Sequence, residues 1–131
     1  VIDKEDADIL RELEKKYNVF SHMTPSYGSF KGCITVKGII TITSTNEVTP
    51  CPYIDFSIGN LRETGLKEIL ERGMRNPWLG PHRPDCLIGE DPKFIKIHTE
   101  KTKGATHLPL PWGKGFSDED SLTAPIVKNN N

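Results

Sequence analysis

The sequence predicts a small α+β fold, with an N-terminal helix, a small β-hairpin followed by an amphipathic helix, and a long irregular C-terminal tail. Three observations indicate this. One run of β-branched residues turns over and returns, two segments carry apolar residues at helical spacing, and 11 Gly and 10 Pro are spread over 131 residues. Only 35% of the residues are hydrophobic, so we expect a modest core that a metal site or a partner domain helps to hold.

The N-terminal helix is predicted over residues 3–17, DKEDADILRELEKKY. Asp3 is suited to cap its first turn, where further acidic residues favour the positive end of the helix dipole. Apolar residues from Ile9 to Tyr17 fall on one face. We interpret this segment as a docking helix.

The hairpin is predicted from the alternating, β-branched run 34–43 and a return strand at 47–49. Asn46 lies at the tip, and Asn tolerates the left-handed conformation that tight turns require. The return strand leads into Cys51, which is held on a stiff segment between two prolines.

A second helix is predicted after residue 58, in GNLRETGLKEILERG. Asn60 followed by Glu63 resembles a capping box, and the apolar residues from Leu66 to Met74 form a helical stripe.

A proline-rich loop with Cys86 follows this second helix, and a short helical or extended piece is predicted at 91–97. From residue 99 the chain becomes polar and is expected to form an irregular tail.

Charge and cysteine usage exclude several classes of function. The formal net charge is −1 with both signs mixed along the chain, which does not indicate a nucleic-acid partner or a membrane-surface face. No apolar run approaches the ~20 residues of a membrane span. The acidic start is not a signal peptide and lacks an initiator Met, so we expect a fragment or a processed chain. An odd, sparse cysteine count disfavours a disulfide framework and favours a reducing, cytoplasmic location.

The three cysteines are predicted to converge. The hairpin places Cys33 and Cys51 at its open end, where neighbouring strands are ~5 Å apart, and the proline-rich loop can deliver Cys86 to the same place. Three thiolates suit a soft metal, either zinc or an iron–sulfur cluster. The spacing is that of neither common zinc sites nor compact ferredoxins, and buried structural thiols are the alternative.

The run from Cys33 through Cys51 to the LKEIL helix resembles the auxiliary-cluster domain, of the SPASM or twitch type, of radical S-adenosylmethionine enzymes. That family has a Cys, a turn Gly, four residues, a second Cys after Pro, then Gly-Asn and an amphipathic helix. Here twelve residues separate Cys33 from Asn46, and four separate Asn46 from Cys51. Asn46 replaces the expected Gly, a change that the turn tolerates. The resemblance covers roughly residues 30–95.

This resemblance implies that Cys33, Cys51 and Cys86 are thiolate ligands of one 4Fe–4S cluster, as in the shorter, twitch form. The fuller form adds a C-x2-C-x5-C-x3-C run for a second cluster, and the sequence has no such run.

A fourth cluster ligand would have to come from another side chain, from a missing domain or from substrate. The side-chain candidates are His82 and Asp85, in the loop of Cys86, and His22, before Cys33. An ordinary surface position is the alternative for each of them.

The resemblance also implies a domain organisation. Residues 1–20 are the N-terminal helix, continuing from a missing radical S-adenosylmethionine barrel domain that is the expected partner. Residues 21–98 are the SPASM/twitch-like domain, and 99–131 the tail. S-adenosylmethionine and a second 4Fe–4S cluster are expected only in the missing domain, because this sequence lacks a C-x3-C-x2-C loop.

The function implied is therefore an auxiliary cluster domain that serves electron transfer or substrate positioning. This polypeptide alone is not expected to be catalytic. The alternative is a zinc-stabilised or metal-free protein-interaction module.

Overall fold

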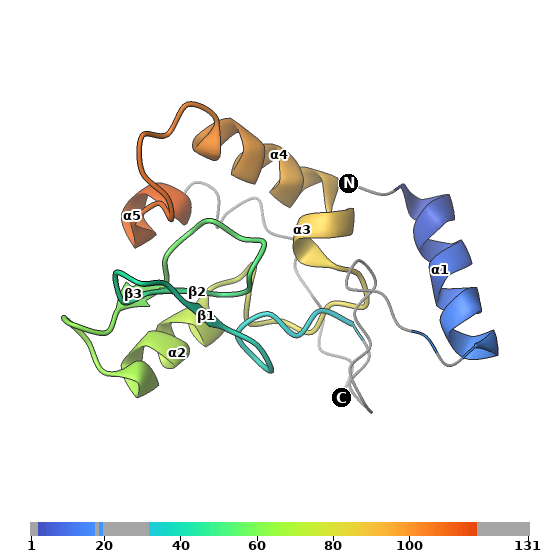
Figure 1. Cartoon of the computed structure of the whole chain (residues 1–131), viewed down its shortest axis with the longest axis horizontal. Helices are drawn as coiled ribbons and strands as arrows, with labels where there is room; N and C mark the ends of the chain where they lie inside the picture. The colour runs from blue at the N-terminus through green and yellow to red at the C-terminus, as the bar shows by residue number, and fades with distance from the viewer. Residues whose placement is uncertain (1–2, 18, 20–31, 118–131) are drawn as a thin grey trace.

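A computed structural model of the chain describes residues 3–17, 19 and 32–117 (Figure 1). In these segments a small antiparallel sheet is combined with helices, which confirms the predicted α+β class. None of the helices described is both long enough and apolar enough to cross a bilayer.

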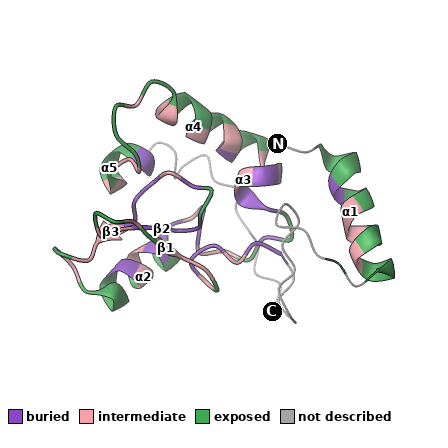
Figure 2. Cartoon of the chain, viewed as in Figure 1, coloured by how far each residue is buried: buried purple, intermediate pink, exposed green. Residues whose placement is uncertain are grey.

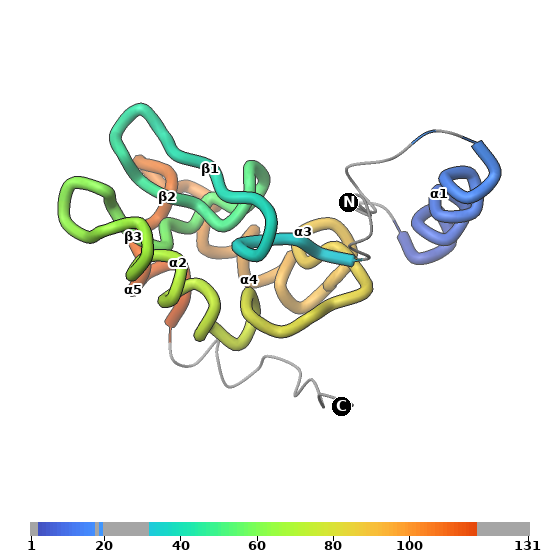
Figure 3. Tube along the Cα trace, turned by 90° about the horizontal axis from the view of Figure 1, so that it is seen from below, coloured from blue at the N-terminus to red at the C-terminus, as the bar shows by residue number. Residues whose placement is uncertain are grey.

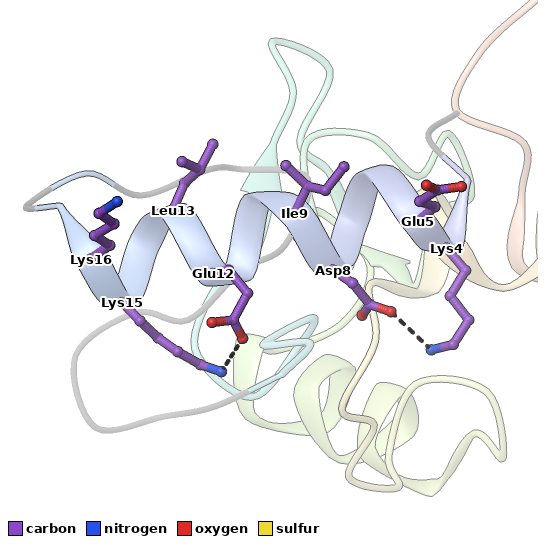
Figure 4. Close-up of a pocket in the computed structure, with 8 residues that line it drawn as sticks. All are labelled: Lys4, Glu5, Asp8, Ile9, Glu12, Leu13, Lys15 and Lys16. Atoms are coloured by element: carbon purple, nitrogen blue, oxygen red, sulfur yellow. Dashed lines mark hydrogen bonds and ion pairs between the residues drawn. The ribbon is translucent and has the colours of Figure 1, made fainter.

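Helix α1 (Lys4–Lys16) begins as predicted, because the Asp3 carboxylate accepts a hydrogen bond from the Asp6 N–H at 2.9 Å. Ala7 is buried, but two residues of the predicted apolar stripe remain exposed: Ile9 is 52% and Leu13 41% accessible in the described part of the chain. Figure 4 shows these two side chains on one side of the helix and the Lys15–Glu12 ion pair elsewhere on its surface. The nearest described element is the short helix that follows Cys86 (Figures 1 and 3).

The sheet has three antiparallel strands, in the spatial order β1 (Thr41–Ile42), β2 (Glu47–Thr49) and β3 (Gly59–Asn60). The hairpin of β1 and β2 turns at Asn46, whose φ of 66° confirms the left-handed turn predicted for that residue. The third strand was not anticipated from the sequence, since it is only two residues long.

Strand β1 is shorter than the predicted run 34–43. The departure occurs at Val36, where a φ of 60° bends the chain away from an extended path. The Val36 N–H donates to the carbonyls of Ile39 and Pro50, both at 3.0 Å. The local bond to Ile39 and the bond to Pro50 across the hairpin override the strand preference of β-branched residues, which depends strongly on context.

Helix α2 (Leu66–Arg75) begins after Gly65, so the predicted capping box at Asn60 is wrong. Asn60 instead belongs to β3, and its side-chain oxygen accepts the Arg62 N–H at 2.9 Å within a turn. The helix packs through Ile69, which is fully buried against Gly59.

Three further helices follow, α3 (Leu87–Glu90), α4 (Pro92–Thr102) and α5 (Trp112–Gly115). Helix α4 is longer than the piece predicted at 91–97. It ends at Thr102, beyond residue 99, where the irregular tail was expected to start. Leu110 holds the part of the tail up to residue 117 on the core through two backbone hydrogen bonds. The Leu110 N–H donates to the Asp55 carbonyl at 2.8 Å, and the Leu110 carbonyl accepts the Ser57 N–H at 2.7 Å. The apolar residues of this polar segment are single and widely spaced, so the sequence has no periodicity that predicts this packing.

Buried residues, purple in Figure 2, come from β2, the loops beside it, α2 and α3, and they form the core. Its largest fully buried side chains come from the loop after β2, from α2 and the loop that follows it, and from α3 and α4: Ile54, Phe56, Ile58, Ile69, Trp78, Leu79, Leu87 and Phe94. Phe56 stacks edge-on against Phe94 and Phe116, with ring centroids 6.1 and 5.2 Å apart. Cys33 and Cys51 belong to this core cluster, and Cys86 is buried as well.

Candidate metal centre

The three cysteines line one cavity of about 90 Å³. Cys33 precedes the bend at the start of the hairpin, Cys51 follows β2, and Cys86 is the residue before α3. All three thiols are buried and unpaired. The remainder of the wall is mostly apolar: Ile34, Thr35, Ile39, Pro52, Tyr53, Ile54, Leu87 and Ile88.

The Cys33 segment is tied to the Cys51 segment through the Pro50 carbonyl. The Thr35 hydroxyl donates to this oxygen at 3.0 Å, and so does the Val36 N–H. Pro50 is itself fully buried. The Thr35 hydroxyl and the left-handed backbone of Val36, an uncommon conformation for a β-branched residue, therefore join the two segments together.

A second link joins Cys33 to the loop of Cys86. The Cys33 N–H donates to the Arg83 carbonyl at 2.9 Å. This close approach requires glycine at position 32, where φ is +100° and an added Cβ would lie 2.1 Å from that same carbonyl oxygen. Gly32 therefore allows the two cysteine-bearing segments to come together.

Cys86 is fixed by Glu90 of α3. The Cys86 N–H donates to the Glu90 carboxylate at 2.7 Å, and the Glu90 N–H donates to the Cys86 carbonyl at 2.8 Å. The same carboxylate binds Arg11 of α1 through both of its oxygens, at 2.7 and 2.8 Å. Helix α1 is thus linked to Cys86 through the buried Glu90 carboxylate, which binds both Arg11 and the Cys86 N–H.

Burial raises the pKa of two of these thiols and so favours their neutral form in the absence of a cation. It raises the pKa of Cys51 to about 12, against opposing backbone hydrogen bonds from Tyr53 and Ile54. It raises the pKa of Cys86 to about 11, with the charge of a Cys33 thiolate adding to the shift. Three thiolates side by side would repel one another, so a positive centre is needed to hold them in that form.

Two cations lie in the surroundings of Cys33. Burial lowers the pKa of Lys37, and a Cys33 thiolate would oppose that shift. The Lys37 ammonium is anchored to the Leu79 carbonyl. Burial likewise lowers the pKa of Arg83, against the charges of Asp91 and Cys33. These cations suit an anionic group at the cavity.

The donor set of the cavity fits an iron–sulfur cluster in its chemistry. Soft thiol ligands, an apolar wall and backbone hydrogen bonds directed at sulfur are the features that such clusters use. Within residues 3–17, 19 and 32–117, no group of three His, Cys, Asp or Glu side chains has the spacing that would hold a single metal ion.

The candidates for a fourth ligand are not brought to this cavity. His82 and Asp85 line a neighbouring hollow, together with Arg83 and Glu90. Asp85 lies 3.5 Å from the Arg11 guanidinium. His22 falls outside the described residues.

Sequence reasoning missed three side chains of this region. Tyr53 lies on the wall of the cavity, Lys37 is anchored near Cys33, and Arg83 is buried within the Cys86 loop. The one signal in the sequence was the position of Arg83, three residues before a cysteine in a proline-rich loop.

Comparison with known proteins agrees with this chemistry. Residues 33–86 match the family model of SPASM, described as an iron-sulfur cluster-binding domain. The chain is 34% identical over 76 residues to an AdoMet-dependent heme synthase of Methanosarcina barkeri (strain Fusaro / DSM 804). That similarity covers 53% of this chain and 22% of the relative, so the chain spans about a fifth of the length of that protein. No solved structure matches the chain significantly.

Proposed function

Residues 33–86 of this chain belong to the SPASM family of iron–sulfur cluster-binding domains, and on that premise we propose that Cys33, Cys51 and Cys86 ligate one 4Fe–4S cluster. The cluster is an auxiliary centre beside a domain that cleaves S-adenosylmethionine within the same protein. The similarity to an AdoMet-dependent enzyme supports this arrangement. The observation that carries the proposal is that three thiols from three separate segments line a single cavity.

Different groups of the cavity would have different roles in holding a cluster. The thiols supply three ligands, and the apolar wall excludes water from the sulfur atoms. Backbone hydrogen bonds from Tyr53 and Ile54 to the Cys51 sulfur stabilise its thiolate form. When bound, a 4Fe–4S cluster supplies one-electron redox chemistry and an iron that can bind a further ligand.

The role that we propose is electron transfer with, or positioning of, a substrate held by the neighbouring domain. Among the described residues, no His, Asp or Glu lines the cavity with the three cysteines. The fourth ligand is then a group from outside this set, either from elsewhere in the protein or from substrate.

The test is anaerobic reconstitution of the chain with iron and sulfide, followed by quantification of both elements. We expect a brown protein with about four irons and four sulfides per chain, as a 4Fe–4S cluster requires. A colourless protein that instead takes up one zinc ion per chain would overturn the proposal in favour of a zinc-stabilised module.

The assignment of Cys86 is tested by Cys86→Ala. Because a thiolate ligand is lost, we expect iron content to fall to a small fraction of that of the unchanged chain. Ile88→Ala is the matched control, since it trims the same cavity wall without removing a ligand and should load normally. Equal iron in the two variants would remove Cys86 from the ligand set.

A further inference from the structure

Arg83 is a buried cation with one unpartnered nitrogen. Its side chain is only 9% exposed. Nε donates to the Trp78 carbonyl at 3.0 Å, Nη1 lies 3.3 Å from the Asp91 carboxylate, and the guanidinium stacks 5.3 Å from the centre of the Trp78 ring. The other terminal nitrogen, Nη2, is buried and has no hydrogen-bond partner in the described part of the chain.

The position of Arg83 relates it to the cysteines. Its backbone carbonyl accepts the Cys33 N–H at 2.9 Å, and it lies in the loop that leads to Cys86. The charge of a Cys33 thiolate opposes the lowering of the Arg83 pKa by burial, as the charge of Asp91 does. Desolvation of a guanidinium is costly unless a counter-charge and full hydrogen bonding offset it, and Arg83 has the counter-charge of Asp91 but an unsatisfied Nη2.

We propose that Arg83 is a positioning residue for the cluster, which fixes a positive charge beside the Cys33 ligand and raises the reduction potential of the centre. This inference rests on the proposed function. Reduction adds one negative charge to the cluster, and a nearby fixed cation stabilises the reduced form more than the oxidised form. Burial limits screening by solvent and salt, and the Asp91 carboxylate offsets part of the charge, so removal of either group should shift the potential.

Three variants test the sign of this effect. Arg83→Gln removes the charge and should lower the potential, whereas Arg83→Lys keeps the charge and should restore most of it. Asp91→Asn removes the counter-charge of Arg83 and should raise the potential. Asn caps helices as well as Asp does, so the cap that Asp91 provides to the N–H groups of Lys93 and Phe94 is retained.

Arg72→Gln is the matched control. Arg72 also stacks on a tryptophan, at 5.9 Å from the Trp112 ring centre, and its Nη1 also donates to a backbone carbonyl, that of Ile58 at 3.3 Å. The substitution therefore removes the same charge and the same kinds of contact, but at Ile58 and Trp112 rather than in the loop whose Arg83 carbonyl accepts the Cys33 N–H.

The readout is a redox titration of the reconstituted chain, followed by the electron paramagnetic resonance signal of the reduced cluster. For Arg83→Gln we expect the ratio of reduced to oxidised cluster at a fixed solution potential to fall about tenfold, which is about 59 mV for one electron. Asp91→Asn should shift the potential in the opposite direction, and Arg72→Gln should leave it unchanged.

Unchanged potentials in both Arg83→Gln and Asp91→Asn would overturn the inference. If Arg83→Gln does not fold, an unchanged or lower potential in Asp91→Asn overturns it alone. Failure of the unchanged chain to take up iron and sulfide would instead contradict the proposed function, so the two failures are distinguishable.

Discussion

Gly32 and Cys33 are the residues at which the segments of the site converge. The Cys33 N–H is bonded to the Arg83 carbonyl, and the absence of a side chain at Gly32 leaves room for that carbonyl. The local sequence around Cys33 therefore does not by itself place the thiol. A contact fifty residues away in the chain does so, through the backbone of the Cys86 loop.

Gly32→Ala should destabilise the chain and abolish cluster loading. The left-handed backbone costs about 1–2 kcal/mol with a side chain, and the clash with the Arg83 carbonyl adds to this. Gly104→Ala is the control, because Gly104 also has a positive φ of +75° but no atom within 4 Å of an added Cβ. Urea denaturation measures both. Equal losses of stability would contradict the role given to the Gly32 contact.

His98 should make stability depend on pH. Burial lowers its pKa, against the opposing charge of Asp55, and its neutral Nε2 accepts the Asp55 N–H at 3.0 Å. A folded pKa below the unfolded value of about 6.5 means that this contribution is fully present above that pH. It is lost as the pH falls through the folded pKa.

We therefore expect the urea midpoint of the metal-free chain to fall as the pH is lowered from about 7 to about 5. His98→Gln, which keeps an acceptor but does not titrate in this range, should flatten that part of the profile. A slope that is the same in both proteins would rule out His98 as its source.

Among the secondary-structure elements, features set by neighbouring residues were predictable from the sequence, and features set by contacts between distant residues were not. The cap at Asp3 and the turn at Asn46 depend on the conformation of one residue and its neighbours, and both were found as predicted. The capping box at Asn60 failed because that residue pairs with β2. The bend at Val36 was missed because its cause is a bond to Pro50, far along the chain.

The cavity shows the same division. Convergence of the three cysteines was predicted from the hairpin, but strand pairing stops at Thr41, and it is the bonds of Thr35 and Val36 to the Pro50 carbonyl that hold Cys33 near Cys51. The surroundings of the thiols were not predictable, since Arg83 and Lys37 reach the region through contacts with the carbonyls of Trp78 and Leu79. No periodicity or spacing in the sequence signals such contacts.

Helix α1 is attached to the site through Arg11 and Glu90. Arg11→Gln should reduce stability by about 1 kcal/mol, because bonds to a charged group are lost but the pair is partly exposed and screened. It should also speed hydrogen exchange of the Cys86 amide, which donates to Glu90. Lys15→Gln breaks an exposed pair on the same helix and should change neither quantity measurably. Unaltered Cys86 exchange in Arg11→Gln would contradict this coupling.

At the scale of the whole molecule, a bound metal centre would add to the folding stability that a modest core supplies. The segments with Cys33, Cys51 and Cys86 are held together by a few backbone bonds and an apolar wall. A ligand that binds the folded state alone adds its binding free energy to folding stability, so a shared cluster would link all three segments.

Loading of the cluster should therefore raise the thermal midpoint. For a domain of this size each 1 kcal/mol corresponds to roughly 4 °C, and anaerobic calorimetry before and after removal of iron by a chelator measures the difference. The Cys86→Ala chain should show no such difference. A midpoint that is the same with and without iron in the unchanged chain would mean that the centre does not hold the segments together.

The most direct measurement is a crystal structure of the anaerobically reconstituted chain, with anomalous diffraction recorded at the iron edge. We expect one compact group of iron peaks inside the cavity, with the sulfur atoms of Cys33, Cys51 and Cys86 bonded to three different irons. Iron bound elsewhere, or an ordered Cys86 thiol directed away from the iron, would contradict it.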